Sequence, residues 1–143
     1  MENEEDEELE RIKQAKLRKM MIDAAPEKGG TTFSKPVAMT DATFKEMIQN
    51  HPLVVIDCWA PWCGPCRLVS PIIEELSRDY VGRIVFGKLN VDDNREVSLK
   101  YNIMSIPTLL VFKNGKLVDT IIGAMPRQTL EQKITRQLGR TRA

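Results

Sequence analysis

Long apolar runs are missing from this chain of 143 residues. No stretch approaches the roughly 18 apolar residues that a membrane-spanning helix needs, so we expect no membrane association. The first residues are mostly acidic and include no apolar core segment, so we also expect no secretory signal. No internal repeat is visible along the chain.

An excess of charge of one sign is also missing. The chain has 21 lysine and arginine residues against 20 aspartate and glutamate residues, and its formal net charge is +1. Nucleic acids are bound mainly through positive charge that neutralises phosphates. We therefore expect no nucleic-acid partner.

Cysteine is scarce, with three residues in the whole chain. An odd and sparse set does not make the disulfide framework of a small secreted protein. We therefore expect a reducing compartment, the cytoplasm. In such a compartment a Cys-x-x-Cys pair more often serves redox or metal chemistry than a structural role.

The first part of the chain is strongly patterned in charge. Seven acids lie within residues 2–10 and five bases within the nine residues that follow, an order that suits a helix dipole. Residues 3–24 are predicted to form an amphipathic helix, and a glycine pair then indicates a linker. We interpret residues 1–35 as an extension and residues 36–143 as the folded domain. The extension is either a solvated arm or a docking or oligomer contact, and we expect a monomer.

Beyond the linker, strand and helix patterns alternate. Their order is β-α-β-α-β-α-β-β-α, which predicts an α/β fold with a mixed sheet and helices on both faces. Asn114-Gly115 indicates a tight hairpin turn between the last two strands. The predicted strands are 37–39, 53–59, 83–91, 108–113 and 117–122, and the predicted helices are 41–49, 63–80, 93–101 and 126–138.

The most informative feature is a pair of cysteines, Cys63 and Cys66, at the predicted junction between a buried strand and a helix. Unpaired backbone N–H groups and the helix dipole favour negative charge at a helix start, so a thiolate at Cys63 is stabilised. Such positions lower a thiol pKa from about 8.5 toward about 7 or below. The pair is therefore predicted to be a reactive dithiol.

Zinc binding is the main alternative for this pair. A structural zinc site needs four ligands, usually two pairs of cysteine or histidine. Only Cys58 and His51 remain as further ligands, and gathering them would distort the predicted strand. Haem attachment would need a histidine at the position of Arg67. We therefore predict a dithiol–disulfide couple, with no metal and no cofactor.

Asp57 places a carboxylate in the middle of an apolar strand, which is costly unless the group is used or paired. Burial raises a carboxyl pKa, so Asp57 is a candidate base near neutral pH. Lys88 shares a strand face with Phe86 and is the predicted partner of Asp57. The alternatives are a solvent-facing strand end for Asp57 and a surface lysine with a buried stem for Lys88.

Four side chains near the pair are assigned by pattern. Trp59 and Pro71 are structural, since the first packs beside the pair and the second bends the helix. Trp62 is placed on the exposed rim. Cys58 faces the opposite side of its strand from Asp57 and is predicted to be a buried, inert thiol.

Three segments together resemble the thioredoxin family. They are residues 55–66, which include the sequence Cys-Gly-Pro-Cys, residues 87–92 and residues 106–115. The resemblance covers roughly residues 36–139 and is specific, because several spaced motifs agree. It implies the thioredoxin fold, a five-stranded mixed sheet flanked by four helices. It also implies that the peptide bond before Pro107 is cis and lies beside the dithiol.

The resemblance further implies a mechanism. Cys63 attacks a substrate disulfide, and Cys66 then attacks Cys63 and releases the reduced substrate. Asp57, acting through water and assisted by Lys88, takes the proton from Cys66. The implied partners are protein disulfide substrates and a thioredoxin reductase. The residues implied to contact substrate are Trp62, Gly64, Pro65, Ile106, Pro107, Gly123 and Ala124.

The chain departs from the family pattern at a few positions. Cys58 stands where phenylalanine is usual, Ser70 and Ser105 replace alanine and glycine, and Arg67 replaces lysine. The first 35 residues have no counterpart in a minimal member of the family. The alternative function is therefore a binding or chaperone module of the same fold whose extension holds a partner.

Overall fold

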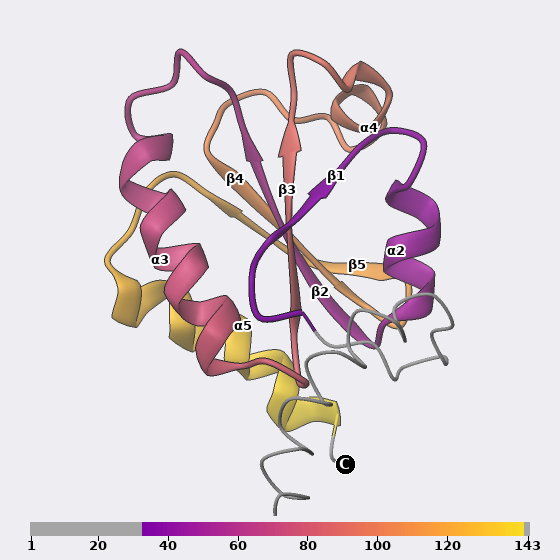
Figure 1. Ribbon diagram of the computed structural model, residues 1–143, viewed down its shortest axis with the longest axis vertical. Helices are drawn as coiled ribbons and strands as arrows, with labels where there is room; N and C mark the ends of the chain where they lie inside the picture. Colours follow the sequence, from indigo (N-terminus) through magenta and orange to yellow (C-terminus); the bar gives the residue numbers. More distant parts are fainter. Residues whose placement is uncertain (1–32, 142–143) are drawn as a thin grey trace, which may run out of the picture. The chain divides into compact units, whose positions relative to one another are not determined.

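The computed structural model describes residues 33–141 (Figure 1). This part of the chain forms a five-stranded sheet with the order β1-β3-β2-β4-β5. The pairs β1/β3 and β2/β3 are parallel, and β2/β4 and β4/β5 are antiparallel. The mixed sheet is thus confirmed. The elements are β1 (Val37–Met39), α2 (Phe44–Asn50), β2 (Leu53–Trp59), α3 (Cys66–Asp79), β3 (Val85–Asn90), α4 (Arg95–Lys100), β4 (Thr108–Lys113), β5 (Lys116–Ile122) and α5 (Arg127–Thr141).

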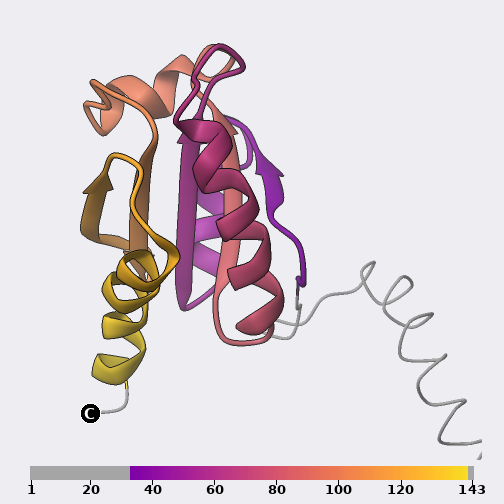
Figure 2. The same cartoon turned by 90° about the vertical axis from the view of Figure 1, so that its left-hand side faces the viewer.

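The sheet is covered on both faces, as the apolar pattern of its central strands predicts. Strand β2 lies in the middle, and six of its seven residues are buried. Helices α3 and α5 cover one face, while α2 lies on the other (Figures 1 and 2). A strand in this position can be apolar on both sides because neither side meets water.

Two apolar clusters hold these layers together, one on each face. Burying one large apolar side chain stabilises the fold by about 1.5–3 kcal/mol, so each cluster is a major contribution. On the face covered by α3 and α5, side chains of the sheet pack with side chains of the two helices. This cluster includes Val55, Phe86 and Leu109 of the sheet and Ile73, Leu76, Leu130 and Ile134 of the helices. The opposite face joins Ile56, Leu89 and Leu110 to Phe44, Ile48 and Val97.

The turn between β4 and β5 has the predicted form. Asn114 and Gly115 have φ values of 52° and 83°, both in the left-handed region. A two-residue hairpin turn of this kind needs positive φ at both positions, and asparagine and glycine adopt it most readily. The turn therefore fixes the register in which Lys113 pairs with Lys116.

Helices α2 and α4 begin later than predicted. A turn first follows Thr40, whose carbonyl accepts hydrogen bonds from the N–H groups of Thr43 and Phe44. Helix α2 then begins at Phe44. Helix α4 begins at Arg95. There the carboxylate of Asp41 accepts hydrogen bonds from the backbone N–H groups of the first turn.

The predicted helix over residues 3–24 and most of the predicted linker lie outside the described residues. The described chain contacts the core from its first residue, because Phe33 packs beside the α2 face and against the ring of His51. The carbonyl of Ser34 accepts a hydrogen bond from Ser77 of α3. No helix in this described part is both long and apolar enough to cross a membrane.

Candidate active site

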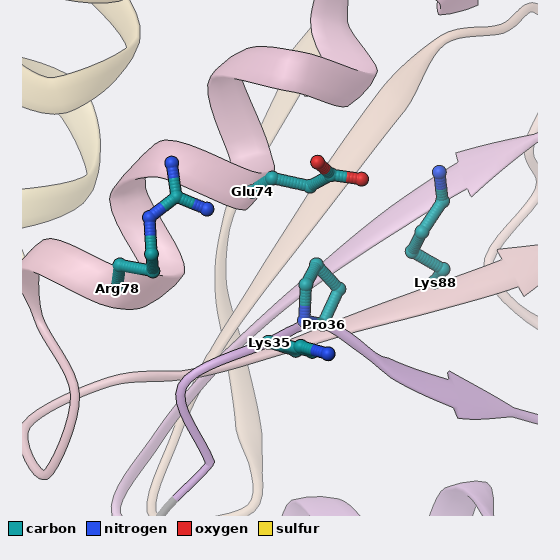
Figure 3. Close-up of a pocket in the computed structure, with 5 residues that line it drawn as sticks. All are labelled: Lys35, Pro36, Glu74, Arg78 and Lys88. Carbon is teal, nitrogen blue, oxygen red and sulfur yellow. The ribbon is translucent and has the colours of Figure 1, made fainter.

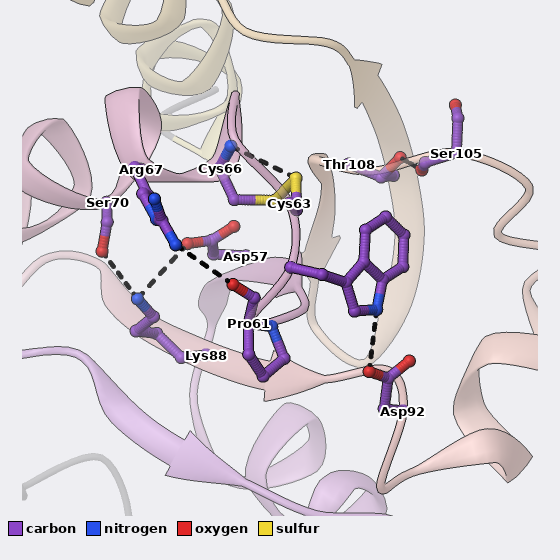
Figure 4. Close-up of a disulfide and its surroundings, with 11 residues drawn as sticks. Asp57, Pro61, Cys63, Cys66, Arg67, Ser70, Lys88, Asp92, Ser105 and Thr108 are labelled. Carbon is purple, nitrogen blue, oxygen red and sulfur yellow. Dashed lines mark hydrogen bonds and ion pairs between the residues drawn. A yellow bond between two sulfur atoms is a disulfide. The ribbon is translucent and has the colours of Figure 1, made fainter.

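Cys63 and Cys66 form a disulfide between the end of β2 and the start of α3 (Figure 4). Their Cα atoms are 5.4 Å apart. A tight turn leads into the helix: the N–H of Cys63 donates to the carbonyl of Ala60, and the N–H of Arg67 donates to that of Gly64. The two residues are 5% and 4% exposed, so little of the disulfide is accessible from the surface.

Helix α3 begins at Cys66, and Cys63 lies in the turn before it, so the prediction of a helix from residue 63 was three residues too early. The backbone N–H of Cys66 donates to the Sγ atom of Cys63 at 3.2 Å. No side chain caps this helix start. The helix dipole and the N–H of Cys66, which donates to Sγ of Cys63, therefore favour a thiolate at Cys63 once the disulfide is reduced.

The cis peptide bond before Pro107 is present, as the family resemblance implied. Ile106 packs against the small cluster formed by Ala60 and the two cysteines. The N–H of Gly123 donates to the carbonyl of Pro107 at 2.9 Å, so the segment that follows β5 reaches the same place. Three segments remote in sequence thus meet beside the disulfide.

Trp62 forms part of the exposed rim, as predicted. Its side chain is 69% exposed, and its indole Nε1–H donates to a carboxylate oxygen of Asp92 at 2.9 Å. Gly64 is exposed, and a Cβ atom there would meet nothing within 4 Å. Trp59 is partly buried against the cysteine cluster, in the packing position assigned to it. Pro71 lies inside α3.

Asp57 is 1% exposed, so the alternative of a solvent-facing strand end is excluded. Neither of its carboxylate oxygens has a hydrogen-bond partner among the described residues. Burial raises the pKa of Asp57 to about 6, and the positive charge of Lys88 offsets part of this rise. The charge of Asp57 therefore changes just below neutral pH.

Lys88 is the neighbour of Asp57 on strand β3, as the parallel register places it. Its Nζ atom lies 3.8 Å from Oδ2 of Asp57 and donates a hydrogen bond to Oγ of Ser70 at 2.7 Å. It also lies 5.0 Å from the centre of the Trp59 ring. The sequence pattern identified the Asp57 contact but gave no signal for Ser70, which is 18 residues away in the chain.

A pocket of about 320 Å³ reaches Lys88 from solvent (Figure 3). The Lys88 side chain is 25% exposed as a result. Water in this pocket can therefore approach the lysine that lies beside the buried carboxylate. The pocket is lined by Lys35, Pro36, Glu74, Arg78 and Lys88.

Cys58 is fully buried on the α2 face. Burial and the nearby charge of Asp57 raise its thiol pKa far above the usual value. A thiol that does not ionise is a poor nucleophile. This agrees with the prediction of an inert thiol that takes no part in exchange.

The zinc alternative receives no support from the geometry. The Sγ atoms of Cys63 and Cys66 are bonded to each other. His51 lies before the first residue of β2, at the opposite end of that strand from the pair, and burial lowers its pKa. Within residues 33–141 no three side chains from histidine, cysteine, aspartate and glutamate gather in a metal-like group.

A disulfide at the start of the helix after the central strand, with a cis-proline segment beside it, is the arrangement of a thiol–disulfide exchange protein. The family model described as Thioredoxin matches residues 35–136. The chain therefore belongs to the thioredoxin family.

Individual relatives agree with this assignment. The thioredoxin of Porphyra purpurea is 48% identical over 101 residues, which is 70% of this chain and 94% of that protein. Thioredoxin 1 of Nostoc sp. is 45% identical and is matched over its whole length, across 74% of this chain. A solved structure of Plasmodium falciparum thioredoxin has a TM-score of 0.66 and 42% identity, covering 70% of this chain and 97% of that one.

Proposed function

We propose that this chain is a general reductase of protein disulfides that works through the Cys63–Cys66 dithiol. The observation that carries the proposal is the disulfide itself, placed at an uncapped helix start with an amide donating to Sγ of Cys63. This arrangement makes Cys63 the better thiolate of the two, and the thiolate is the attacking species.

In the proposed reaction, the Cys63 thiolate attacks one sulfur of a substrate disulfide. A mixed disulfide forms, and the other substrate sulfur leaves as a thiolate. The thiolate of Cys66 then attacks Sγ of Cys63, which releases the second substrate sulfur and forms the disulfide seen in the structure. Two electrons have passed from the protein to the substrate.

Asp57 is proposed as the base for the second step. Cys66 must lose its proton to attack, and a carboxylate whose pKa is about 6 is ionised at pH 7 yet basic enough to accept that proton. We propose that a water molecule carries the proton between them. The positive charge of the Lys88 ammonium, 3.8 Å away, favours the ionised carboxylate and so limits the rise in its pKa.

Substrate chains are proposed to lie across the exposed rim and the cis-proline segment. Trp62 offers an exposed aromatic face, and the exposed Gly64 leaves room for a chain to approach. Ile106 and Gly123 bring the neighbouring segments to the same surface. The proposed contact set is Trp62, Gly64, Pro65, Ile106, Pro107, Gly123 and Ala124.

The proposed electron donor is a thioredoxin reductase, and the chain is proposed to act as a monomer in the cytoplasm. The low cysteine content supports a reducing compartment. Relatives named "Thioredoxin M-type, chloroplastic", such as that of Pisum sativum at 46% identity, make a plastid the alternative location. Fractionation of cells that express the full chain would separate the two.

Reduction of insulin disulfides with dithiothreitol as electron source tests the proposal. We expect the chain to accelerate the reaction and Cys63→Ser to abolish the acceleration. A redox titration of the pair should give a potential near the roughly −270 mV of thioredoxin. If Cys63→Ser remains active and removal of the extension abolishes function, the alternative of a binding or chaperone module is correct.

A further inference from the structure

The ammonium group of Lys88 is shared unequally among three neighbours. It donates to Oγ of Ser70 at 2.7 Å, lies 3.8 Å from Asp57 and lies 5.0 Å from the centre of the Trp59 ring. Only the first is a hydrogen-bond distance. The hydrogen bond of this lysine therefore goes to a neutral hydroxyl, although a buried carboxylate lies close by.

Ser70 is well placed to act on the redox pair through this contact. It lies four residues after Cys66 on α3, and residues at this spacing lie on the same side of a helix. Asp57 approaches from the sheet beneath, with Leu109 as its uncharged neighbour on β4. Figure 4 shows the contacts of Lys88 with Ser70 and with Asp57, and Asp57 lies between that lysine and the disulfide.

An ammonium that is hydrogen-bonded to a carboxylate lowers the carboxyl pKa more than an ammonium that is held further away. A charge-assisted hydrogen bond would hold Asp57 in its ionised form and make it a weaker base. In this structure both Asp57 oxygens are buried without a hydrogen-bond partner in the described chain. The charge of Lys88 lowers the Asp57 pKa only in part, and no hydrogen bond from a described residue lowers it further.

We propose that Ser70 is a positioning residue, whose hydroxyl holds the ammonium of Lys88 out of hydrogen-bond reach of Asp57 and so keeps that carboxylate free to accept the proton of Cys66. The inference rests on the proposed function and deepens it. The proton leaves the Sγ–H of Cys66, passes to Asp57 and later returns to solvent. The resulting thiolate attacks Sγ of Cys63.

Other charges around Lys88 bear on the outcome of removing the hydroxyl. Glu74 and Arg78 of α3 and Lys35 line the pocket on the solvent side. Asp57 is the carboxylate on the buried side, and neither of its oxygens has a hydrogen-bond partner within residues 33–141. Without the Ser70 hydroxyl, the ammonium of Lys88 is stabilised most by moving from 3.8 Å to hydrogen-bond distance of Asp57.

The test is the titration of the Asp57 carboxyl carbon by NMR in the oxidised full-length protein. In Ser70→Ala we expect the midpoint to move to lower pH by about half a unit or more, since the ammonium closes on the carboxylate. Ser70→Thr keeps the hydroxyl and should titrate as the native chain does. Ser77→Ala removes a buried hydroxyl from the same helix that contacts the carbonyls of Ser34 and Glu74, and should leave the midpoint unchanged.

A kinetic measurement extends the test to the reaction. In single turnovers with a substrate disulfide at pH 7, Ser70→Ala should slow the resolution step about twofold, because a weaker base takes the Cys66 proton. Attack by Cys63 should keep its rate. A purely structural serine would change neither the midpoint nor the ratio of the two rates.

An unchanged midpoint in Ser70→Ala overturns the inference. A midpoint that moves to higher pH also overturns it, because Ser70 would then be holding the lysine close to the carboxylate. The titration uses the oxidised protein and needs no substrate. Its failure is therefore distinguishable from failure of the proposed function, which would appear as absent insulin reduction by the native chain.

Discussion

Asp57 is the residue at which stability and chemistry oppose each other. An ionised carboxylate with 1% exposure and no hydrogen-bond donor in the described part of the chain destabilises the fold. The same burial gives it the pKa of about 6 that suits a base at neutral pH. Lys88 reduces the destabilisation without removing it, since its ammonium stays 3.8 Å away.

Asp57→Asn should therefore raise the free energy of unfolding above pH 6. The folded pKa of about 6 exceeds the unfolded value of about 3.9, so the folded state holds the proton to higher pH. Native stability should fall as pH rises from about 4 through 6 and then level off. The variant should gain on the order of 3 kcal/mol at pH 8 and little at pH 4. Urea titrations at both values measure this, and a less stable variant at pH 8 would contradict it.

The same substitution should slow disulfide reduction at the step in which Cys66 resolves the mixed disulfide. The loss should be about 10-fold or more at pH 7, in the range expected for removing a general base. It should shrink toward pH 9, because Cys66 then ionises without help. Single-turnover rates between pH 6 and 9 check this, and an equal rate at every pH would show that Asp57 is not the base.

Much of the site could be predicted from single residues, and the rest depended on contacts between distant segments. The Cys63–Cys66 spacing and a carboxylate in an apolar strand are visible in the sequence. The alternation of Lys88 with Phe86 indicated the face on which it lies. By contrast, Ser70 and Asp92 show no local pattern, because their roles come from hydrogen bonds that span 18 and 30 residues of chain.

At the scale of elements, helix α4 is capped from a distance. Its own N-cap residue, Asn94, makes no side-chain hydrogen bond to the helix. The carboxylate of Asp41 instead accepts from the N–H groups of Glu96 and Val97 at 3.2 and 3.0 Å. The side-chain oxygen of Asn94 accepts in turn from the N–H of Asp41. These bonds join the turn before α2 to the start of α4.

Removing this cap should weaken the fold without affecting chemistry. Asp41→Ala leaves two N–H groups of α4 without their acceptor and should lower the free energy of unfolding by about 1 kcal/mol. Insulin reduction should be unchanged, since neither α4 nor the turn before α2 carries a proposed active-site residue. Urea denaturation and the activity assay together test this. A loss of activity at full stability would contradict it.

Strands and the hairpin were predicted closely, whereas helix starts were not. Strand β2 is predicted by its own run of apolar residues. The hairpin turn is predicted by Asn114 and Gly115, which readily adopt positive φ. The start of α4 depends on Asp41, which lies more than 50 residues before the helix. The start of α3 at Cys66 follows from the turn that the packed cysteine segment makes.

We propose that residues 1–35 are an N-terminal extension, of which only the last few, from Phe33 on, pack against the domain. The five strands and both apolar clusters are built from residues after Phe33. Phe33 and Ser34 contact the core, so a truncation should keep them. The family model begins at residue 35, close to this boundary.

Deleting residues 1–32 should therefore leave a cooperatively folding domain that reduces insulin within a few-fold of the full chain. The physical reason is that no element of the sheet or of the site is removed. Calorimetry and the insulin assay on the full chain and on the shortened chain provide the test. Phe33→Ala in the full chain is the control for losing the core contact next to the deletion. A collapse of the melting temperature on deletion, larger than that control explains, would show that the extension packs on the domain.

Trapping the mixed disulfide tests the roles proposed for the two cysteines. Cys66→Ser should accumulate a covalent complex with a substrate protein through Cys63, because attack proceeds and resolution cannot. Cys63→Ser should trap nothing and lose turnover. Non-reducing electrophoresis and peptide mapping identify the bonded cysteine. Turnover by Cys63→Ser, or a complex joined through Cys66 in that variant, would contradict the account.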